Sequence, residues 1–476
     1  MTPNLNRRAF VFGLAGSLVL APLSRALAQA SATGLGAANQ RKYSGVLIRN
    51  VRIFDGINDH LQAGHLLIHG QTISQVSRDA IAAPPGCIVI DGGNRVLMPG
   101  LTDAHWHMTM VANTMADLEA ADTGLMYANT VAEARRTVLR GFTTVRDMAG
   151  PTFGIKQAID QGVIVGPRVY PSGELISATG GHGDFSPIYG SAQILGGSAS
   201  HLEDIGEFAV VNGVPQVLAA TREQLKRGAS QIKIAVGGGV ISSFDPIDSI
   251  QFTLDEIRAA VEAASDWDTY VAAHVYTSAG IRRALKGGVR SIEHGHLADE
   301  ATIALIGQDK AWLSTQPFEP GDDPLTPAQL KKTADMVGAW KRILGYAKKH
   351  DVRVAFGTDL LFQPEGGAKQ NLMLTRLAQV YSNFNVLRIA TSGNCTLFAM
   401  SGNRNPYKQA RLGVLQPGAW ADMLLVEGDP TRDIEVLKDY ERNFVVIIKD
   451  GVVQKNAFNG TLAPLATTAA PDSALA

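Results

Sequence analysis

Two histidines separated by one residue stand at the end of an apolar run. Residues 99–107 read PGLTDAHWH, so His105 and His107 alternate along an expected strand. Alternate residues of a strand point to the same side, and both imidazoles can therefore reach one point at the strand's carboxyl end. An HxH pair alone is a weak signal, because such histidines more often lie on a surface or in a core.

A lysine, two more histidines and an aspartate occupy similar positions later in the chain. Lys233 lies in the apolar run QIKI, and His274, His294 and Asp359 each follow a β-rich run. A lysine on a half-buried strand is ordinarily exposed at an edge. The alternative is a modified side chain: an ammonium has no lone pair for a metal, whereas a lysine carboxylated by CO2 is an anion that can bridge two metals.

Strand-like and helix-like runs alternate between these residues. We expect strands at 142–147, 167–172, 230–236, 269–275, 289–293, 311–315 and 352–357, and amphipathic helices at 254–266 and 278–286. The alternation predicts an α/β fold, a (β/α)8 TIM barrel over residues 99–405, with all six chemistry-bearing residues on its catalytic face at the strand ends. A doubly wound sheet is the alternative, but no GxGxxG motif follows the first strand.

Both ends of the chain contain short β-rich runs broken by glycine, aspartate and asparagine. They lie at 45–54, 65–78, 87–98, 422–427 and 444–455. We expect them to pair in a small antiparallel module, a β-sandwich domain of residues 42–98 and 406–456. Residues 457–476 are rich in proline, alanine and threonine, which predicts a disordered tail.

The first residues have the features of a targeting signal. Arg7 and Arg8 precede an apolar stretch, residues 9–23, that is too short for a membrane span, and residues 26–28 read as a cleavage site. We expect residues 1–28 to be a twin-arginine signal peptide, with an ordinary secretory signal as the alternative. The mature protein is then exported, periplasmic or secreted, without a membrane span.

The composition excludes several classes of function. The 476 residues carry 43 basic and 44 acidic side chains, and 45% are hydrophobic. Such a chain can bury a large core, and its neutral balance argues against a nucleic-acid partner. Cys87 and Cys395 are the only cysteines, too few for a disulfide framework or a zinc knuckle. A metal would therefore be held mainly by histidine, aspartate, glutamate or an unusual ligand.

Together these motifs resemble the amidohydrolase superfamily, over nearly the whole chain up to ADMLLVEGDP at 421–430. Three further segments resemble one branch of it: TVRD at 144–147, GGHGD at 180–184 and HVYTSAGI at 274–281. That branch contains zinc carboxypeptidases, Xaa-Pro dipeptidases and ochratoxin-hydrolysing amidases, with imidazolonepropionase-like enzymes as close relatives.

The resemblance implies a centre of two divalent metals. His105, His107 and Asp359 would hold the more buried metal, His274 and His294 the second, and N6-carboxylated Lys233 would bridge them. Zinc is the expected metal, and manganese or cobalt would fit the same ligands. A bridging hydroxide would attack the amide carbonyl, with Asp359 as general acid and base.

Other residues are expected to serve the substrate or the ligands. His182, in a glycine-rich loop, and Tyr276, two residues after His274, are expected to contact the substrate; a turn-stabilising histidine and a packed aromatic are the alternatives. Asp103 is expected to accept a hydrogen bond from a ligating histidine. Arg146 is expected to form a structural ion pair below the site.

The sequence therefore predicts a metal-dependent hydrolase of C–N bonds. The expected substrate is a small amide or peptide: a C-terminal peptide bond, an N-acyl amino acid or an ochratoxin-like aryl amide. A cyclic-amide hydrolase of the imidazolonepropionase type and a lactonase or phosphotriesterase are alternatives. A catalytically silent exported binding protein is the alternative from another class. Because relatives in the branch are often multimeric, we also expect a homo-oligomer.

Overall fold

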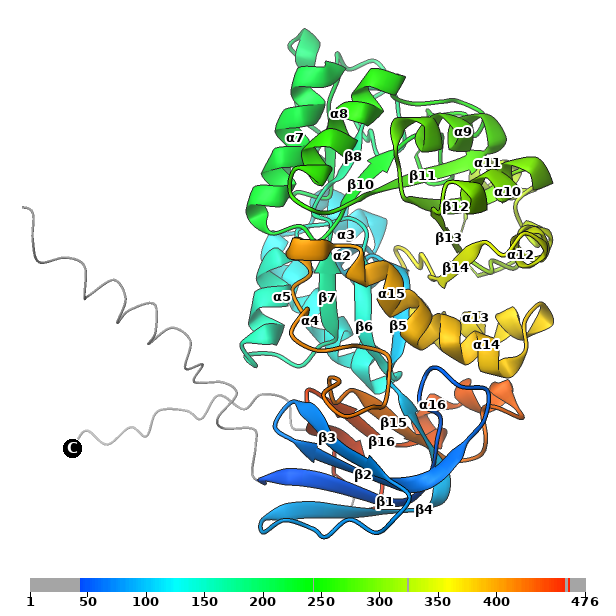
Figure 1. Cartoon of the computed structure of the whole chain (residues 1–476). Coiled ribbons are helices and arrows are strands. Elements are labelled where there is room, and N and C mark those ends of the chain that lie inside the picture. The colour runs from blue at the N-terminus through cyan, green and yellow to red at the C-terminus, as the bar shows by residue number, and fades with distance from the viewer. Residues whose placement is uncertain (1–42, 243, 323–324, 459–460, 463–476) are drawn as a thin grey trace, which may run out of the picture.

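The computed structural model describes residues 43–242, 244–322, 325–458 and 461–462. The expected signal peptide, residues 1–28, and most of the expected tail lie outside this part of the chain. Figure 1 shows a barrel with helices on its outside and a smaller β domain at one end of the molecule. The β domain holds strands from both ends of the chain.

Eight parallel strands form the barrel. They belong to two hydrogen-bonded groups, β5-β6-β7 and β14-β13-β12-β11-β10, and the second group continues into β8 and β9. Asp359 N–H donates to the His105 carbonyl at 2.7 Å and Ser230 N–H to the Pro171 carbonyl at 2.7 Å, so both edges close. The barrel strands are β5 (Leu101–Trp106), β6 (Phe142–Asp147), β7 (Arg168–Pro171), β10 (Ile232–Ala235), β11 (Val271–Thr277), β12 (Ser291–Leu297), β13 (Trp312–Thr315) and β14 (Arg353–Phe356), and the two additional strands are β8 (Leu175–Ser177) and β9 (Phe208–Val210).

Local capping sets the ends of the barrel helices. The Thr253 hydroxyl accepts the Glu256 N–H while the Glu256 carboxylate accepts the Thr253 N–H, a capping box that starts α8. The helices are α2 (Met108–Ala112), α3 (Met115–Ala120), α4 (Thr123–Leu139), α5 (Phe153–Asp160), α6 (His201–Asp204), α7 (Gly213–Arg227), α8 (Leu254–Ser265), α9 (Ser278–Gly287), α10 (Glu300–Gln308), α11 (Pro327–Thr333), α12 (Ala339–Lys349), α13 (Gln370–Arg376), α14 (Asn383–Arg388), α15 (Asn394–Ala399) and α16 (Tyr440–Asn443). Shorter helical turns are η1 (Gln193–Leu195), η2 (Gly366–Lys369), η3 (Leu377–Gln379), η4 (Ile389–Gly393), η5 (Gly402–Arg404) and η6 (Ile434–Leu437).

The predicted barrel is confirmed. β6 has the expected bounds, the other expected strands are present within a few residues, and α8 and α9 begin where the sequence predicts. The agreement follows from the pattern, because the strands are short apolar runs and the helices have capping residues at their starts.

The β domain is one mixed sheet in the order β18-β17-β16-β15-β4-β1-β2-β3. Its strands are β1 (Gly45–Ile53), β2 (Gln62–His69), β3 (Thr72–Ser77), β4 (Cys87–Pro99), β15 (Met423–Val426), β16 (Phe444–Lys449), β17 (Val452–Asn456) and β18 (Thr461–Leu462). The expectation of a purely antiparallel module is wrong at one pair. β1 and β4 are parallel, because the β2–β3 hairpin occupies one side of β1 and the chain returns along the other. β18 lies within the predicted tail.

Side chains of the β domain alternate between two apolar cores. Val96 and Met98 of β4 pack in the cluster of the barrel, whereas Leu97 between them packs in a separate cluster of the β domain. Leu424 and Leu425 of β15 divide in the same way. β4 also runs into β5 with a single residue, Gly100, between them. The β domain is therefore anchored to the strand that carries His105.

Candidate active site

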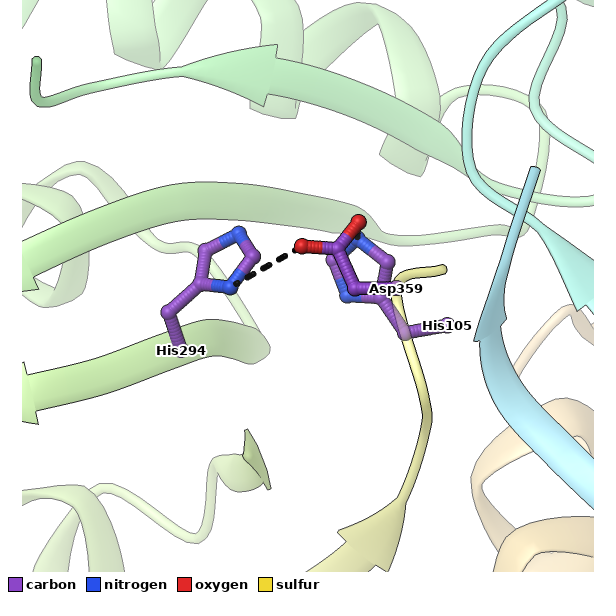
Figure 2. Close-up of side chains that lie close together, drawn as sticks. All are labelled: His105, His294 and Asp359. Atoms are coloured by element: carbon purple, nitrogen blue, oxygen red, sulfur yellow. Dashed lines mark ion pairs between the residues drawn. The ribbon is translucent and has the colours of Figure 1, made fainter. Parts of the chain in front are cut away.

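The six predicted ligands meet at the carboxyl ends of the barrel strands. β5 carries His105, β10 Lys233, β11 His274 and β12 His294, while His107 and Asp359 follow β5 and β14. The four histidines and Lys233 are each at most 6% exposed. Figure 2 shows the side chains of His105, His294 and Asp359 converging from three separate strands.

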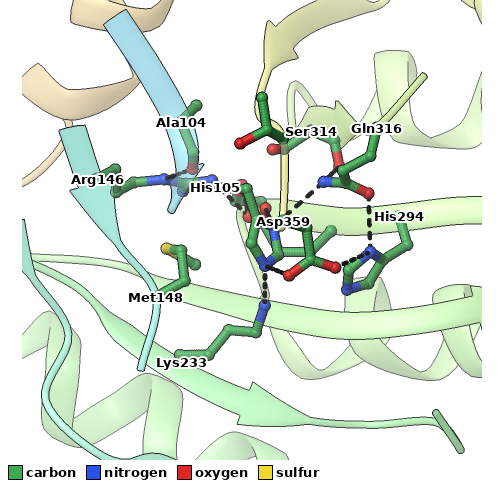
Figure 3. Close-up of polar contacts among 12 residues, drawn as sticks. Ala104, His105, Arg146, Met148, Lys233, His294, Ser314, Gln316 and Asp359 are labelled. Atoms are coloured by element: carbon green, nitrogen blue, oxygen red, sulfur yellow. Dashed lines mark hydrogen bonds and ion pairs between the residues drawn. The ribbon is translucent and has the colours of Figure 1, made fainter. Parts of the chain in front are cut away.

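Asp359 is the centre of this group. Its Oδ1 lies 3.1 Å from Nε2 of His107 and 3.4 Å from Nε2 of His105, and its Oδ2 lies 3.8 Å from Nδ1 of His294. Nζ of Lys233 is 3.3 Å from Nε2 of His105 (Figure 3). The His274 and His294 rings are 4.4 Å apart between centroids. Nitrogen and oxygen donors from five strand ends therefore face one small space.

Two of these residues have an unusual backbone. His294 has φ 76° and Asp359 has φ 55°, the left-handed region that non-glycine residues adopt at some cost in free energy. Gly357 allows the last strand to approach the first, because a Cβ there would lie 2.4 Å from Cβ of His105. The surrounding packing thus imposes the directions of the His294 and Asp359 side chains.

Burial keeps the histidines neutral. It lowers the pKa of His294 to about 3 and holds the pKa of His105 and of His274 well below the usual range. A neutral imidazole keeps a lone pair for a metal or a proton. Burial also lowers the pKa of Lys233 to about 8. Burial alone would raise the pKa of Asp359, but the surrounding imidazoles hold it well below its usual range, so this carboxylate is ionised at neutral pH.

The donor set fits a divalent metal. Ligand atoms of His105, His294 and Asp359 all lie within 4.8 Å of one another. Nε2 of His294 and Nδ1 of His107 are buried and, within the described residues, have no hydrogen-bond partner. A buried nitrogen without a partner destabilises the folded state by about 1–3 kcal/mol. Coordination to a metal would offset this loss. Neutral imidazoles and one carboxylate are ligands that zinc accepts.

A buried ion pair orients His105 from below. Nη2 of Arg146 lies 2.7 Å from Oε1 of Glu293, and Oε2 of Glu293 lies 2.8 Å from Nδ1 of His105. Arg146 and Glu293 are both fully buried. The expected ion pair of Arg146 is therefore present, and its partner is a residue that the sequence reasoning missed. The signal was a glutamate inside the strand SIEHGHL, directly before a predicted ligand.

Asp103 does not accept from an imidazole. Its Oδ1 accepts the main-chain N–H of His105 at 3.0 Å, and its Oδ2 accepts the Thr358 hydroxyl at 2.6 Å. Asp103 thus accepts a hydrogen bond from a predicted ligand as expected, but from its main chain, because Glu293 already occupies Nδ1 of the His105 ring. Gln316, just after β13, was also missed: its Oε1 lies 2.8 Å from Nδ1 of His294.

His182 and Tyr276 border the same cavity as the ligands. The cavity has a volume of about 560 Å³ and is otherwise mostly apolar, with Met110, Phe185 and Phe208 among its lining residues. The Tyr276 ring stacks on the His294 ring at 4.9 Å, and the His182 ring stacks on the His274 ring at 4.0 Å. Both side chains therefore lie where a substrate bound beside the ligands would touch them.

A family match covers most of the chain. Residues 96–463 match the Amidohydrolase family. The chain belongs to this family. Amidohydrolases act on C–N bonds, so the protein is a hydrolase of such bonds. The family generally uses metals, in agreement with the donor set around Asp359.

Three relatives show which amidohydrolases the chain resembles. Ochratoxinase from Aspergillus niger is 29% identical over 416 residues, which are 83% of this chain and 83% of that protein. The chain is 33% identical in sequence to an amidohydrolase of known crystal structure, with a TM-score of 0.77. This match covers 87% of this chain and 99% of that chain. The chain is 31% identical to a prolidase whose crystal structure is a complex with N-methylphosphonate-L-proline, with a TM-score of 0.79. This match covers 87% of this chain and 100% of that chain. These relatives support the branch that the sequence motifs indicate.

None of the helices in the described part of the chain is both long enough and apolar enough to cross a membrane.

Proposed function

We propose that the protein is a binuclear metal-dependent amidohydrolase that cleaves an amide bond next to an apolar or aromatic group. The observation that carries this proposal is the convergence of five strand ends, with four neutral imidazoles, one carboxylate and one buried lysine, on a mostly apolar cavity. The similarity to ochratoxinase and to a prolidase supports an amide as the substrate.

The metal roles are assigned to the six converging residues. His105, His107 and Asp359 would hold one ion and His274 and His294 the other, with Lys233 carboxylated on Nζ as the bridge. Lys233 supports this role by its position, because it is 1% exposed and its Nζ contacts a ligand nitrogen. Bound metals, with zinc as the expected pair, supply Lewis acidity and lower the pKa of water in the site.

The chain's own residues handle the proton and the substrate. The ionised Asp359 carboxylate accepts the proton of the attacking water and returns it to the leaving nitrogen. His182 and Tyr276 contact the scissile amide from the side of the cavity, while the apolar walls exclude bulk water. Glu293 fixes the ring of His105 through Nδ1, so that Nε2 faces the ligand group.

The cavity lining favours a substrate with a large apolar group over a short polar peptide. Beyond Lys233 and Asp359, Glu319 is the charged residue among the described lining, and no arginine is present there. A substrate carboxylate would lack a guanidinium partner here, and this applies equally to acyl-amino acids, ochratoxin-like amides and dipeptides. An ochratoxin-like aryl amide or an acyl-amino acid with an aromatic acyl group fits better than a short polar peptide, because the aromatic group can pack against the apolar walls.

Metal analysis together with a substrate panel tests this function. The mature protein should bind about two metals per chain and hydrolyse aromatic N-acyl amino acids and ochratoxin faster than Xaa-Pro dipeptides. Lys233→Ala should lose metal and activity, and a short added carboxylate should restore part of both. Two metals with cleavage of cyclic amides or esters alone would favour the imidazolonepropionase-like or lactonase alternative. A protein that binds no metal after reconstitution would refute the proposal and leave the binding-protein alternative.

Export and assembly are part of the same proposal. We infer a twin-arginine signal in residues 1–28 and a homo-oligomeric mature protein. Replacing Arg7 and Arg8 by lysine should block export by that route, and continued export would indicate an ordinary secretory signal. Light scattering of the mature protein measures its oligomeric state, and a monomeric mass would contradict the second inference.

A further inference from the structure

Three consecutive glycines follow β10, and one of them makes room for His182. A Cβ on Gly239 would lie 1.8 Å from Nδ1 of His182 and 2.2 Å from its Cε1. On its other face the His182 ring stacks on His274, with 4.0 Å between centroids and 16° between planes. The imidazole is therefore held between a bare main chain and a predicted metal ligand.

The loop after Gly239 also supplies partners for Nδ1 of His182. Oγ of Ser242 lies 2.8 Å from this nitrogen and Oδ2 of Asp245 lies 3.6 Å from it. Oδ2 of Asp245 also accepts the Gly239 N–H. Asp245 is fully buried. These contacts occupy Nδ1, so Nε2 is the ring nitrogen left for a substrate in the cavity that His182 lines.

A single ammonium group fastens this loop. Nζ of Lys332, on α11, donates to the carbonyl oxygens of Gly239 at 3.0 Å, Ser242 at 2.7 Å and Asp245 at 2.9 Å. All three N–H groups of this ammonium therefore donate to carbonyls of one short segment. The same Nζ lies 3.6 Å from Oδ1 of Asp245, so its charge also offsets the buried carboxylate. The three carbonyls belong to the residue that cradles His182 and to the two that contact Nδ1.

We propose that Lys332 and Asp245 are positioning residues for His182. Lys332 fixes Gly239, Ser242 and Asp245 against α11, and this holds the Ser242 and Asp245 side chains against Nδ1, which sets the direction of Nε2. Only the kinetic part of this proposal rests on the proposed function, because it requires that His182 contact the scissile amide through Nε2. Sub-ångström placement of such a group is worth a large factor in rate, since a 1 Å error costs on the order of 100-fold.

Substitution of Lys332 tests the kinetic part. Lys332→Met keeps the aliphatic stem and removes the ammonium. It should lower kcat roughly 10- to 100-fold with a smaller change in KM and an unchanged metal content. Asp245→Asn, which keeps the shape of the side chain and an acceptor for Gly239, should lower kcat in the same way. Lys331→Met is the matched control, because Lys331 is its exposed neighbour on α11, and it should leave kcat unchanged.

A double-mutant cycle separates positioning from general stability. If Lys332 acts through His182, Lys332→Met should have almost no further effect on kcat in a His182→Asn background. Equal losses in both backgrounds would overturn the proposal. So would wild-type kcat in both Lys332→Met and Asp245→Asn.

Hydrogen–deuterium exchange gives a readout that does not need a substrate. Lys332→Met should speed exchange of the Gly239 amide, which is bonded to Asp245, and Lys331→Met should not. Unchanged exchange at the Gly239 amide would overturn the role of Lys332. If the wild-type enzyme hydrolyses no amide, the proposed function fails, and the exchange measurement still decides whether Lys332 fixes the loop.

Discussion

Glu293→Gln is the substitution whose outcome the structure defines most sharply. Glu293 lies between two buried groups, with one oxygen 2.7 Å from Arg146 and the other 2.8 Å from His105. Arg146 also donates to the Ala104 carbonyl at 2.6 Å and to the hydroxyls of Tyr270 and Ser291 at 3.2 Å. The amide keeps the shape of the side chain and removes its charge.

Two separate losses follow from the lost charge. Arg146 would remain buried without a counter-ion, and breaking a buried pair in this way costs about 3–5 kcal/mol. His105 would lose its anionic acceptor at Nδ1, and such losses weaken metal binding about 10- to 100-fold. A surface pair gives the control: Glu300 pairs with the exposed Lys349, so Glu300→Gln should change the free energy of unfolding by less than about 1 kcal/mol.

The assay combines urea unfolding with metal titration. Glu293→Gln should lose both stability and metal affinity. Adding Arg146→Met removes the unpaired cation, so the double variant should regain much of the stability while metal affinity stays low. If the double variant recovers metal affinity together with stability, Glu293 serves only to neutralise Arg146, and the argument for orientation of His105 is wrong.

Three further outcomes are expected. Asp359→Asn should lower kcat about 100- to 10,000-fold, because the proton carrier is lost; steady-state rates at full metal occupancy measure this, and a change below tenfold would contradict it. Gly239→Ala should displace His182, since the new Cβ would lie 1.8 Å from Nδ1, and should lower kcat, whereas Gly345→Ala, with open space at its Cβ, should not. Burial raises the pKa of Glu207 to about 8 from 4.5, so the folded state holds this proton longer than the unfolded chain. Glu207 should therefore lower stability as pH rises from about 4.5 to about 8. Burial also raises the pKa of Asp103 to about 6 and of Asp147 to about 7, so Glu207→Gln should make the fall less steep in thermal unfolding curves at a series of pH values; an unchanged slope would refute the assignment.

The barrel and the six converging residues were predictable because both depend on local pattern. Each strand is an apolar run, and each predicted ligand is a polar residue at a run's end, as His274 and His294 illustrate. The topology of a barrel then brings strand ends together whatever their distance along the chain. Family resemblance supplied the metal roles, which residue spacing alone does not assign.

The partners of these residues were not predictable in the same way. Glu293 and Asp103 are both buried acids near histidines, and the choice between them depends on side-chain direction, which the sequence does not encode locally. Asp245 lies in an irregular loop without periodicity, and its role depends on Lys332, which approaches from a separate helix. The parallel pairing of β1 with β4 likewise depends on the path of the connecting chain.

The order of strands in the β domain has a consequence for synthesis of the chain on the ribosome. β4 pairs with β1 on one side and with β15 on the other, so the early strands expose an open edge until residues 423–426 emerge. Asp359, which closes the barrel against His105, also arrives late. A nascent chain must therefore carry an unpaired edge and an unfinished barrel through most of translation. Long-range pairings of this kind form slowly and favour aggregation of the incomplete chain. We therefore expect that a chaperone that shields the nascent chain raises the yield of folded protein more than a substitution that slows unfolding of the finished protein.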